Sequence, residues 1–225
     1  MSAGRATPLS SADLSEARAR MVERQLRRRG ITDERVLEAM SRVPRELFVP
    51  DGLGHLAYAD GALPIGYGQT ISQPFIVATI CSLLGLSGDE RVLDVGTGSG
   101  YQAAVLAELA DEVVTIERVP ELAERSRTAL AAAGHPDVDV RVGDGSLGVP
   151  DKAPYHAIAV AAAAPTVPPA LYEQLADGGR LVVPRGGRAG QDLVLVERTP
   201  SGPVERRSVS CRFVPLLGEE GFSSG

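Results

Sequence analysis

The central part of the chain alternates short apolar runs with stretches of helical spacing. The apolar runs lie at 91–95, 113–117, 138–142, 156–160 and 180–183. The helical stretches lie at 75–84, 101–109, 121–133 and 168–175. Strands that alternate with helices are typical of a parallel sheet with helices on both faces. The pattern therefore predicts an α/β fold with a doubly wound, mostly parallel sheet.

Two further apolar runs follow without a helix between them. They lie at 192–198 and 204–213, and the segment Thr-Pro-Ser-Gly-Pro at 199–203 separates them. Parallel neighbours need a long crossover connection, whereas a short turn is enough to join antiparallel strands. We therefore expect a C-terminal antiparallel hairpin at one edge of the sheet, which brings the sheet to seven strands.

The N-terminal part of the chain is predicted to be helical. Residues 1–12 are small and polar, which is typical of a flexible tail. Asp13, with Glu16 three residues later, resembles a capping box at the start of a helix that ends at Gly30. Thr32 is the expected cap of a second helix. These two helices would form a helical cap on the domain.

Periodicity fails over the segment 48–72, which is rich in Gly, Pro and Asp. A long irregular segment inside a compact domain is often functional. The predicted organisation is a flexible tail at 1–12 and a single domain at 13–225. Within that domain, a helical cap and an active-site loop at 13–72 precede the core at 73–217.

Composition and charge narrow the range of functions. The chain has 225 residues, of which 44% are hydrophobic, and a formal net charge of -6. An acidic protein lacks the basic surface that phosphate binding requires, so nucleic acid is not an expected ligand. No apolar stretch approaches the roughly 20 residues that span a bilayer, and the N-terminus lacks a signal-peptide core. We expect a soluble cytoplasmic protein without membrane contact.

The cysteines and the distribution of apolar residues bear on metal binding and on oligomeric state. Cys81 and Cys211 are in no zinc-ligand pattern and predict two reduced thiols, so no metal site is expected. The pattern leaves no apolar face unexplained, and a monomer is therefore expected.

A glycine-rich turn, Gly96-Thr-Gly-Ser-Gly100, follows the run 91–95 and precedes a helical stretch. A doubly wound sheet binds nucleotide-like ligands at such a turn. The dinucleotide fingerprint would place Gly or Ala where this chain has Tyr101. Asp94 would repel a pyrophosphate but suits a positive sulfonium. The turn therefore favours S-adenosylmethionine over NAD, the alternative being a tight strand-to-helix turn without a ligand.

Two acids at the ends of later strands are candidates for cofactor contact. Glu117 ends a strand at a place where a carboxylate can accept hydrogen bonds from a ribose diol. The alternative is a surface carboxylate paired with Arg118. Asp144, between two glycines after the next strand, could accept from an adenine amino group, and a plain turn is equally compatible with it.

Six blocks of sequence occur in a characteristic order. They are Val43-Pro-Arg-Glu-Leu-Phe-Val49, Leu63-Pro-Ile-Gly-Tyr-Gly-Gln-Thr-Ile-Ser-Gln-Pro74, Arg91-Val-Leu-Asp-Val-Gly-Thr-Gly-Ser-Gly-Tyr-Gln102, Gly143-Asp-Gly145, Ala162-Ala-Ala-Pro165 and Arg212-Phe-Val-Pro-Leu216. Together they resemble the protein-L-isoaspartate (D-aspartate) O-methyltransferase family. The resemblance runs from about Met21 to Gly218. The glycine turn is common among class I methyltransferases, whereas the block at 63–74 is more particular to this family.

The resemblance implies a Rossmann-like class I methyltransferase fold and a repair reaction. The family transfers the methyl group of S-adenosylmethionine to the free carboxylate of L-isoaspartyl or D-aspartyl residues in damaged proteins, and S-adenosylhomocysteine is the other product. The methyl ester then collapses to a succinimide, which opens partly to normal aspartate. The implied partners are proteins and peptides that contain isoaspartyl residues.

Site residues follow from the turn, the acids and the resemblance. The resemblance makes Ser72 the active-site serine, in contact with the substrate. The candidate cofactor-binding residues are Gln69, Thr70, Ile71, Asp94, Gly96, Thr97, Gly98, Ser99, Glu117, Arg118, Asp144 and Gly145. The implied substrate-binding segment is Val214, Pro215 and Leu216. Family members often have a Thr where this chain has Ala161, so a polar role at that position is not expected.

Carboxylate methylation needs no strong general base, because a carboxylate is already ionised at neutral pH. We expect the Ser72 hydroxyl to donate a hydrogen bond that orients the substrate carboxylate, and not to act as a nucleophile. The alternative is that Ser72 only caps the helix that follows Pro74.

Three other functions are compatible with parts of the sequence. A related carboxyl O-methyltransferase would act on an aspartate of a biosynthetic peptide or on a small molecule. A cofactor-binding module would act through partners without turnover. A nicotinamide oxidoreductase is disfavoured by both Tyr101 and Asp94.

Overall fold

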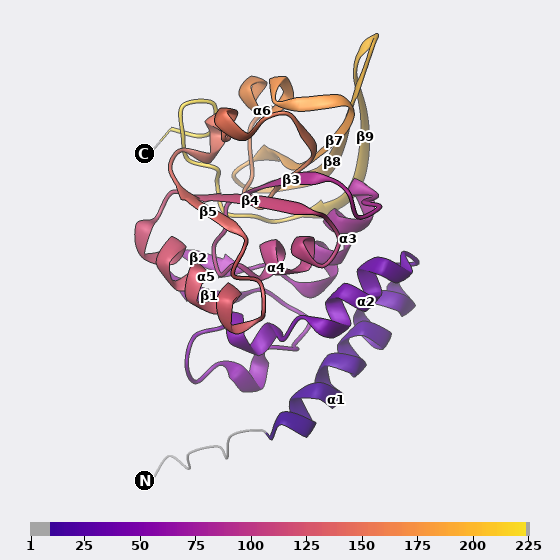
Figure 1. Cartoon of the computed structure of the whole chain (residues 1–225), viewed down its shortest axis with the longest axis vertical. Coiled ribbons are helices and arrows are strands. Elements are labelled where there is room, and N and C mark those ends of the chain that lie inside the picture. The colour runs from indigo at the N-terminus through magenta and orange to yellow at the C-terminus, as the bar shows by residue number, and fades with distance from the viewer. Residues whose placement is uncertain (1–9, 224–225) are drawn as a thin grey trace.

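Seven strands form one mixed sheet in the order β5-β4-β3-β6-β7-β8-β9 (Figure 1). The computed structural model describes residues 10–223. The strands are β3 (Arg91–Val95), β4 (Glu112–Glu117), β5 (Asp139–Val142), β6 (Tyr155–Val160), β7 (Leu175–Gly187), β8 (Gly190–Thr199) and β9 (Gly202–Cys211). Strands β3 to β7 pair in parallel, while β8 and β9 are antiparallel to their neighbours. The predicted seven-stranded, mostly parallel sheet with an edge hairpin is confirmed.

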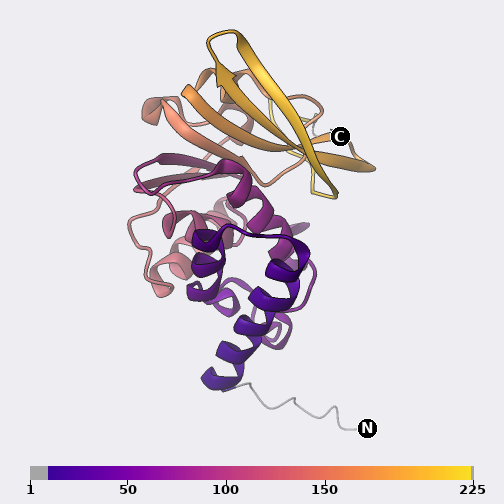
Figure 2. The same cartoon turned by 90° about the vertical axis from the view of Figure 1, so that its right-hand side faces the viewer.

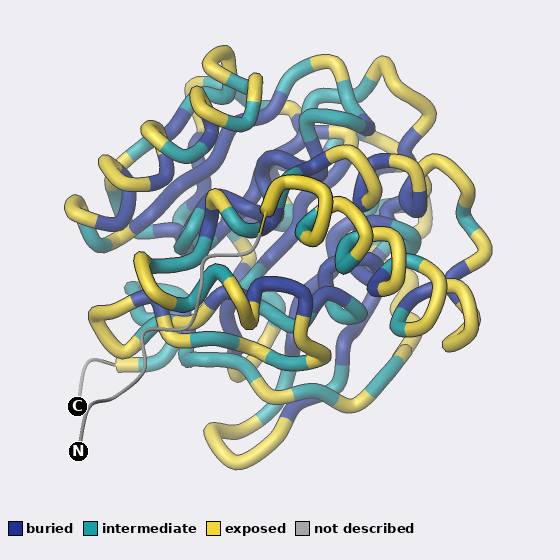
Figure 3. Tube along the Cα trace, turned by 90° about the horizontal axis from the view of Figure 1, so that it is seen from below, coloured by how far each residue is buried: buried dark blue, intermediate teal, exposed yellow. Residues whose placement is uncertain are grey.

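Each face of the sheet carries its own apolar core. Helices α3 (Pro74–Leu84), α4 (Tyr101–Ala107) and α5 (Pro120–Ala132) cover one face, and the short α6 (Pro169–Glu173) covers the other. Neighbouring strand residues point to opposite faces, so Val92 joins the first core and Leu93 the second. Figure 3 shows the buried strands inside exposed helices and loops. Burial on both faces explains why these strands are continuous apolar runs.

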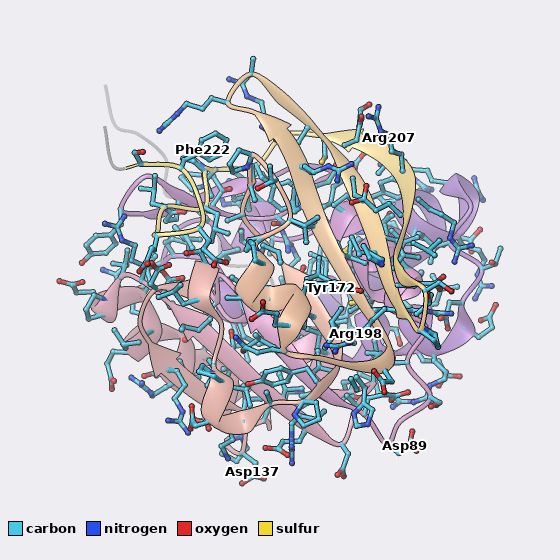
Figure 4. All side chains as sticks on the ribbon, turned by 90° about the horizontal axis from the view of Figure 1, so that it is seen from above. Asp89, Asp137, Tyr172, Arg198, Arg207 and Phe222 are labelled. Atoms are coloured by element: carbon cyan, nitrogen blue, oxygen red, sulfur yellow. The ribbon has the colours of Figure 1, made fainter. Side chains whose placement is uncertain are left out.

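The C-terminal part of the sheet is more extended than the sequence predicts. Strand β7 begins at Leu175, and α6 accordingly ends at Glu173. A short turn joins β7 to β8, so the sheet closes with two successive hairpins instead of one. Arg198 of β8 lies against Tyr172 of α6, with 5.7 Å between the guanidinium carbon and the ring centroid (Figure 4). In Figure 2 the β8–β9 hairpin and the N-terminal helices lie at opposite ends of the molecule.

The first helix begins earlier than its acidic residues suggest. Ser10 is the N-cap of α1 (Ser11–Met21), and its hydroxyl accepts a hydrogen bond from the Asp13 N–H. The Asp13 carboxylate accepts from the Ser10 N–H at 3.0 Å, so the expected capping box is displaced by three residues. Residues 10–12 of the predicted tail therefore belong to the cap and the helix, and residues 1–9 lie outside the described chain. The helical segment continues through a wider turn and ends at Gly30 as expected.

Asp33, and not Thr32, caps the second helix. Its carboxylate accepts from the N–H groups of Arg35 and Val36 at the start of α2 (Glu34–Arg42). A carboxylate at the N-cap satisfies two free donors and complements the helix dipole, which a neighbouring threonine one residue earlier does not do. Helix α2 packs against α3 and α4, and residues 22–26, which continue α1, pack against α2 and α3. The cap therefore lies over the first core, away from the sheet (Figure 1).

The segment 48–72 contains a small hairpin that periodicity does not reveal. Strands β1 (Leu63–Gly66) and β2 (Gln69–Ile71) pair antiparallel around a turn in which Gly66, Tyr67 and Gly68 all have positive φ. Strands of three or four residues are too short to show an alternating pattern. The helix α3 then begins with Gln73 as its N-cap and has no side-chain cap, so the interpretation of Ser72 as a helix cap is wrong.

Within the part of the chain that the structure describes, no helix is long and apolar enough to cross a bilayer. The same residues contain no group of three or more His, Cys, Asp or Glu side chains placed to hold a metal ion. Cys81 and Cys211 are free thiols, and burial raises the pKa of the Cys211 thiol to about 11.

Candidate active site

A cavity lies at the carboxyl ends of the parallel strands. It encloses about 870 Å³, part of which is open to solvent. Its lining comes from separate parts of the chain, namely residues 69–72, 96–99, 116–119, 145, 161–162 and 214–217, together with Val77, Tyr101 and Gln102. Ligands of open α/β sheets bind at this end of the strands. Folding therefore gathers most of the candidate residues around one space.

Backbone hydrogen bonds to the sheet hold the glycine turn. The N–H groups of Gly96 and Thr97 both donate to the carbonyl of Ile116 on β4, at 2.9 and 3.3 Å. Gly96, Gly98 and Gly100 have positive φ. At Gly100, a Cβ atom would lie 3.2 Å from the Cβ of Ser126 on α5, so glycine also permits close helix packing. The turn is therefore fixed before any ligand binds.

Glu117 lines the cavity as a largely buried carboxylate. Its Oε2 accepts from the Gly98 N–H at 2.8 Å, and its Oε1 accepts from the Val119 N–H at 2.9 Å. The side chain thus ties the end of β4 to the glycine turn, and only 7% of the residue is exposed. The interpretation of Glu117 as a surface carboxylate is therefore wrong. Each oxygen retains capacity for a further donor, such as a ribose hydroxyl.

Asp94 lies one layer beneath the glycine turn and is not part of the cavity lining. It is fully buried, and its carboxylate accepts from the Gln102 amide at 2.7 Å and from the Thr115 hydroxyl at 2.9 Å. Burial raises the pKa of Asp94 to about 6, against the opposing effect of these hydrogen bonds. Gln102, which Asp94 holds, does line the cavity. Asp94 is therefore connected to the cavity through Gln102 and does not line it.

The hairpin β1–β2 and the residue after it form the opposite wall. Gln69, Thr70, Ile71 and Ser72 all line the cavity, as the resemblance implies. Ile71 is buried, whereas Thr70 is exposed. The Ser72 carbonyl accepts from Nη2 of Arg45 at 2.8 Å, which fixes the backbone that carries the hydroxyl. Arg118, the other charged residue in the lining, lies on the side of Glu117.

Gly145 and Asp144 have different positions relative to the cavity. Gly145 lines it, and a Cβ atom there would lie 2.8 Å from Cγ1 of Val95, so only glycine fits. Asp144 is not in the lining, and its carboxylate accepts from Ser146 and from the Glu219 N–H at 2.8 Å. Burial alone would raise the pKa of Asp144, but these hydrogen bonds outweigh it and lower the pKa.

The segment Val214–Leu217 closes the remaining side. The Ala163 N–H donates to the Val214 carbonyl at 2.8 Å, and the Leu216 N–H donates to the Ala163 carbonyl at 2.7 Å. The tail then folds back, and the Phe222 N–H donates to the Leu216 carbonyl. Phe222 lies at the outer margin of the molecule (Figure 4). The sequence offered no signal for this tail, because its contacts with Asp144 and Ser146 join residues more than seventy positions apart.

The other lining residues were not among the sequence candidates. Those whose side chains complete the cavity include Val77, Tyr101, Gln102, Ile116, Val119, Ala161, Ala162 and Leu217. Ala161 contributes a methyl group near Gly96, in agreement with the absence of a polar role at that position. Tyr101 attracted notice only as a departure from a dinucleotide fingerprint, and its ring also packs edge-on against Phe48 at 5.7 Å.

Comparison with known families gives a match over most of the chain. The family model of protein-L-isoaspartate(D-aspartate) O-methyltransferase matches residues 16–221. Protein-L-isoaspartate O-methyltransferase 2 of Marinobacter nauticus is 57% identical to the chain over 212 residues, which cover 93% of this chain and 97% of the relative. The protein-L-isoaspartate O-methyltransferase of Methanoregula boonei is 54% identical, over 93% of this chain and 97% of its own length.

Two solved structures resemble the fold over nearly the whole chain. A protein-L-isoaspartate O-methyltransferase aligns with a TM-score of 0.80 and 29% identity, covering 90% of this chain and 66% of its own. A Plasmodium falciparum protein described as a protein-L-isoaspartate O-methyltransferase, solved in complex with S-adenosyl-L-homocysteine, aligns with a TM-score of 0.78 and 25% identity. That alignment covers 89% of this chain and 98% of the other.

Proposed function

The chain belongs to the protein-L-isoaspartate(D-aspartate) O-methyltransferase family, and we propose that the family's reaction takes place in the cavity described above, with Ser72 on the substrate side and Glu117 on the cofactor side. The reaction is methyl transfer from S-adenosylmethionine to the free carboxylate of an isoaspartyl residue. The chain aligns with protein-L-isoaspartate O-methyltransferases over nearly their full length, and the enzyme is one of them.

One observation carries the assignment of the site. The loop 69–72, the turn 96–99, Glu117 and the segment 214–216 come from four distant parts of the sequence and line one cavity. These are the segments that the family resemblance singles out. Their meeting at the carboxyl ends of the parallel strands supports a shared role for them in binding cofactor and substrate.

The residues on the sheet side fit S-adenosylmethionine, which supplies a methyl group on a positive sulfonium. Glu117 offers carboxylate lone pairs for a ribose diol. Ile116, Gly145 and Leu216 provide apolar surface that suits the flat face of an adenine. The start of α4 adds backbone N–H groups suited to a carboxylate group of the ligand. We propose that Glu117 and the glycine turn bind the cofactor directly and that Asp94 and Asp144 support them from behind.

On the loop side, we propose that Ser72 orients the substrate carboxylate. Ser72 lies in the lining, and donation from its hydroxyl to one carboxylate oxygen would fix the direction of the other. Because the carboxylate is already ionised, the site has to supply alignment and exclusion of water, and not a strong base. The hairpin β1–β2 covers this side of the cavity and would exclude water once a peptide is bound.

The substrate peptide would lie along the segment 214–216. Val214 and Leu216 already bond to Ala163, and neighbouring residues of an extended chain point to opposite sides. The carbonyl of Pro215 therefore points away from Ala163, toward a position where a peptide N–H could donate to it. Backbone contacts of this kind accept many sequences, which suits a repair enzyme whose partners are damaged proteins.

We propose that the enzyme acts as a cytoplasmic monomer. Within the described residues, the segments proposed to bind cofactor and substrate all come from one chain, and the proposed reaction uses no residue of a second copy. Two free thiols suit a reducing compartment.

The test is methyl transfer from labelled S-adenosylmethionine to a short isoaspartyl peptide and to its normal aspartyl twin. We expect the label on the isoaspartyl peptide alone. Equal labelling of both peptides would contradict isoaspartyl specificity. No labelling of either peptide, with S-adenosylhomocysteine still bound, would point to a different carboxylate acceptor.

A further inference from the structure

Arg45 is a fully buried arginine behind the loop wall of the cavity. It follows α2, in the turn that leads from the helical cap toward the hairpin. None of its surface is exposed. Its Nε donates to the Ala57 carbonyl at 2.7 Å, and its Nη2 donates to the Ser72 carbonyl at 2.8 Å. One side chain from the cap thus holds the backbone at the active-site serine.

The charge of this guanidinium is not neutralised by a carboxylate. Among residues 10–223, no Asp or Glu forms an ion pair with Arg45, and its Nη1 is buried without an acceptor. The neighbouring acid, Glu46, pairs instead with Arg18 and with the Tyr58 hydroxyl. Arginine stays protonated even where burial lowers its pKa, so a net positive charge remains in the interior.

This charge packs against the ring of Tyr101, a residue that lines the cavity. The guanidinium carbon lies 4.7 Å from the ring centroid, and Arg45 itself is not among the lining residues. Arg45 therefore cannot touch a substrate while it keeps this position. An aromatic face stabilises a nearby cation without cancelling its field.

The sheet side of the cavity carries two carboxylates, with Arg118 in the lining beside one of them. Asp94 is fully buried beneath the turn, and Glu117 is largely buried at its rim. A substrate carboxylate that enters the cavity adds another negative charge to this group, and like charges repel more strongly where water is excluded. A buried positive charge on the loop side would offset this repulsion for a negatively charged acceptor.

We propose that Arg45 is a positioning residue that fixes the Ser72 backbone and, through its uncancelled charge, makes the site prefer an ionised carboxylate over a neutral group of the same shape. This inference rests on the proposed role of the cavity, and it adds an electrostatic basis for acceptor selection. It assigns the selection to a residue of the helical cap that never contacts the acceptor.

The experiment compares two peptides that differ only at the acceptor. One carries the isoaspartyl carboxylate, and the other carries the neutral carboxamide in its place and is measured as a competitive inhibitor. The quantity of interest is the inhibition constant of the carboxamide divided by the KM of the carboxylate. We expect Arg45→Met to lower this ratio about tenfold, the size of an interaction between charges roughly 10 Å apart at an effective dielectric constant of about 20.

Arg45→Lys separates charge from geometry. Lysine keeps the positive charge but loses the planar fork that bonds two carbonyls, so we expect a lower kcat with most of the ratio retained. Arg125→Met is the matched control, because Arg125 is an exposed cation on α5 that lies over the Tyr67 ring at the tip of the hairpin. Solvent screens an exposed charge, and its loss should change the ratio less than about twofold.

The outcomes are distinct. A KM and an inhibition constant that rise together in Arg45→Met, with the ratio unchanged, would show a purely structural role and overturn the inference. An equal change of the ratio in Arg125→Met would also overturn it. If thermal unfolding shows that Arg45→Met is not folded, Arg45→Lys decides alone. A lower ratio of the carboxamide inhibition constant to the carboxylate KM in Arg45→Lys would then overturn the inference. Absence of methyl transfer in the wild-type protein would instead refute the proposed function.

Discussion

The two walls of the cavity are built in different ways. On the sheet wall, Gly96 and Thr97 are bonded to the carbonyl of Ile116 and Glu117 is bonded to the turn, so backbone groups of the central strands fix the geometry. On the loop wall, a hairpin of two short strands carries Ser72, and a single guanidinium from the cap holds its carbonyl.

We infer from this difference that the two walls have different roles, one for the cofactor and one for the peptide. A wall built from the sheet is rigid before the ligand arrives, which suits a cofactor of constant structure. A wall held mainly by two long-range side chains, Arg45 at Ser72 and Arg125 at the hairpin, can adjust to peptides of different sequence. Hairpins of this kind are commonly the parts of an enzyme that move on binding. Substitutions on the sheet wall should therefore affect cofactor affinity, while those on the loop wall should affect the substrate.

The largest effect is expected on the sheet wall at Glu117. Glu117→Ala removes the proposed acceptor for the ribose and leaves the N–H groups of Gly98 and Val119 without their partner. Charge-assisted hydrogen bonds contribute about 1.5 to 3 kcal/mol each, so affinity for S-adenosylhomocysteine should fall more than about 100-fold. Titration calorimetry measures it. Glu124→Ala, at an exposed acid of α5, is the control and should leave the affinity unchanged.

A second test concerns the buried charge beneath the same wall. The pKa of Asp94 is raised from 3.8 to about 6 on folding, so the folded state binds this proton more tightly than the unfolded state. Its contribution to stability is therefore present at pH 4 and is lost as the pH rises through about 6. Between pH 4 and pH 7 the wild type should lose about 2 kcal/mol of unfolding free energy relative to Asp94→Asn.

Urea unfolding at several pH values measures this difference. Subtracting the curve of Asp94→Asn from that of the wild type removes the titration of the other acids. Parallel curves for the two proteins would show that the pKa of Asp94 is not changed by folding.

The third test asks whether the C-terminal tail supports the sheet wall. A Cβ atom at Gly218 would overlap the carboxylate of Asp144 and the hydroxyl of Ser146. Overpacking of a fixed contact costs about 1 to 3 kcal/mol, so Gly218→Ala should lower the unfolding free energy by about 2 kcal/mol. Gly61→Ala is the control, because a Cβ atom there meets nothing within 4 Å. Equal unfolding free energies for the two variants would mean that the tail moves aside without cost and does not support the sheet wall.

The smallest effect is expected on the loop wall at Ser72. Ser72→Ala removes one hydroxyl donor and leaves its backbone bond to Arg45 in place. A single hydrogen bond to a charged group is worth about 1.5 kcal/mol, so kcat/KM for an isoaspartyl peptide should fall about tenfold. The affinity for S-adenosylhomocysteine should stay the same. A loss of cofactor affinity as large as that of the peptide would remove the distinction between the two walls.

The sheet was accessible from the sequence because its strands are buried on both faces. The strand Arg91–Val95 matches the expected range, and the glycine turn after it lines the cavity. Local chemistry was less decisive at helix starts, where Ser10 and Asp13 or Thr32 and Asp33 are all acceptable caps. Neighbours on the folded chain, and not the residue type, select between such candidates.

By itself, the sequence determined the order of strands and helices, the glycine turn, and the loop around Ser72, because periodicity and short motifs are local properties. Only the tertiary structure decided that Glu117 lines the cavity while Asp94 and Asp144 lie outside its lining. Only the tertiary structure brought Arg45, twenty-seven residues earlier in the chain, to the carbonyl of Ser72. Burial, hydrogen-bond partners and the field of an unpaired charge depend on segments far apart in sequence, which meet only when the chain is packed.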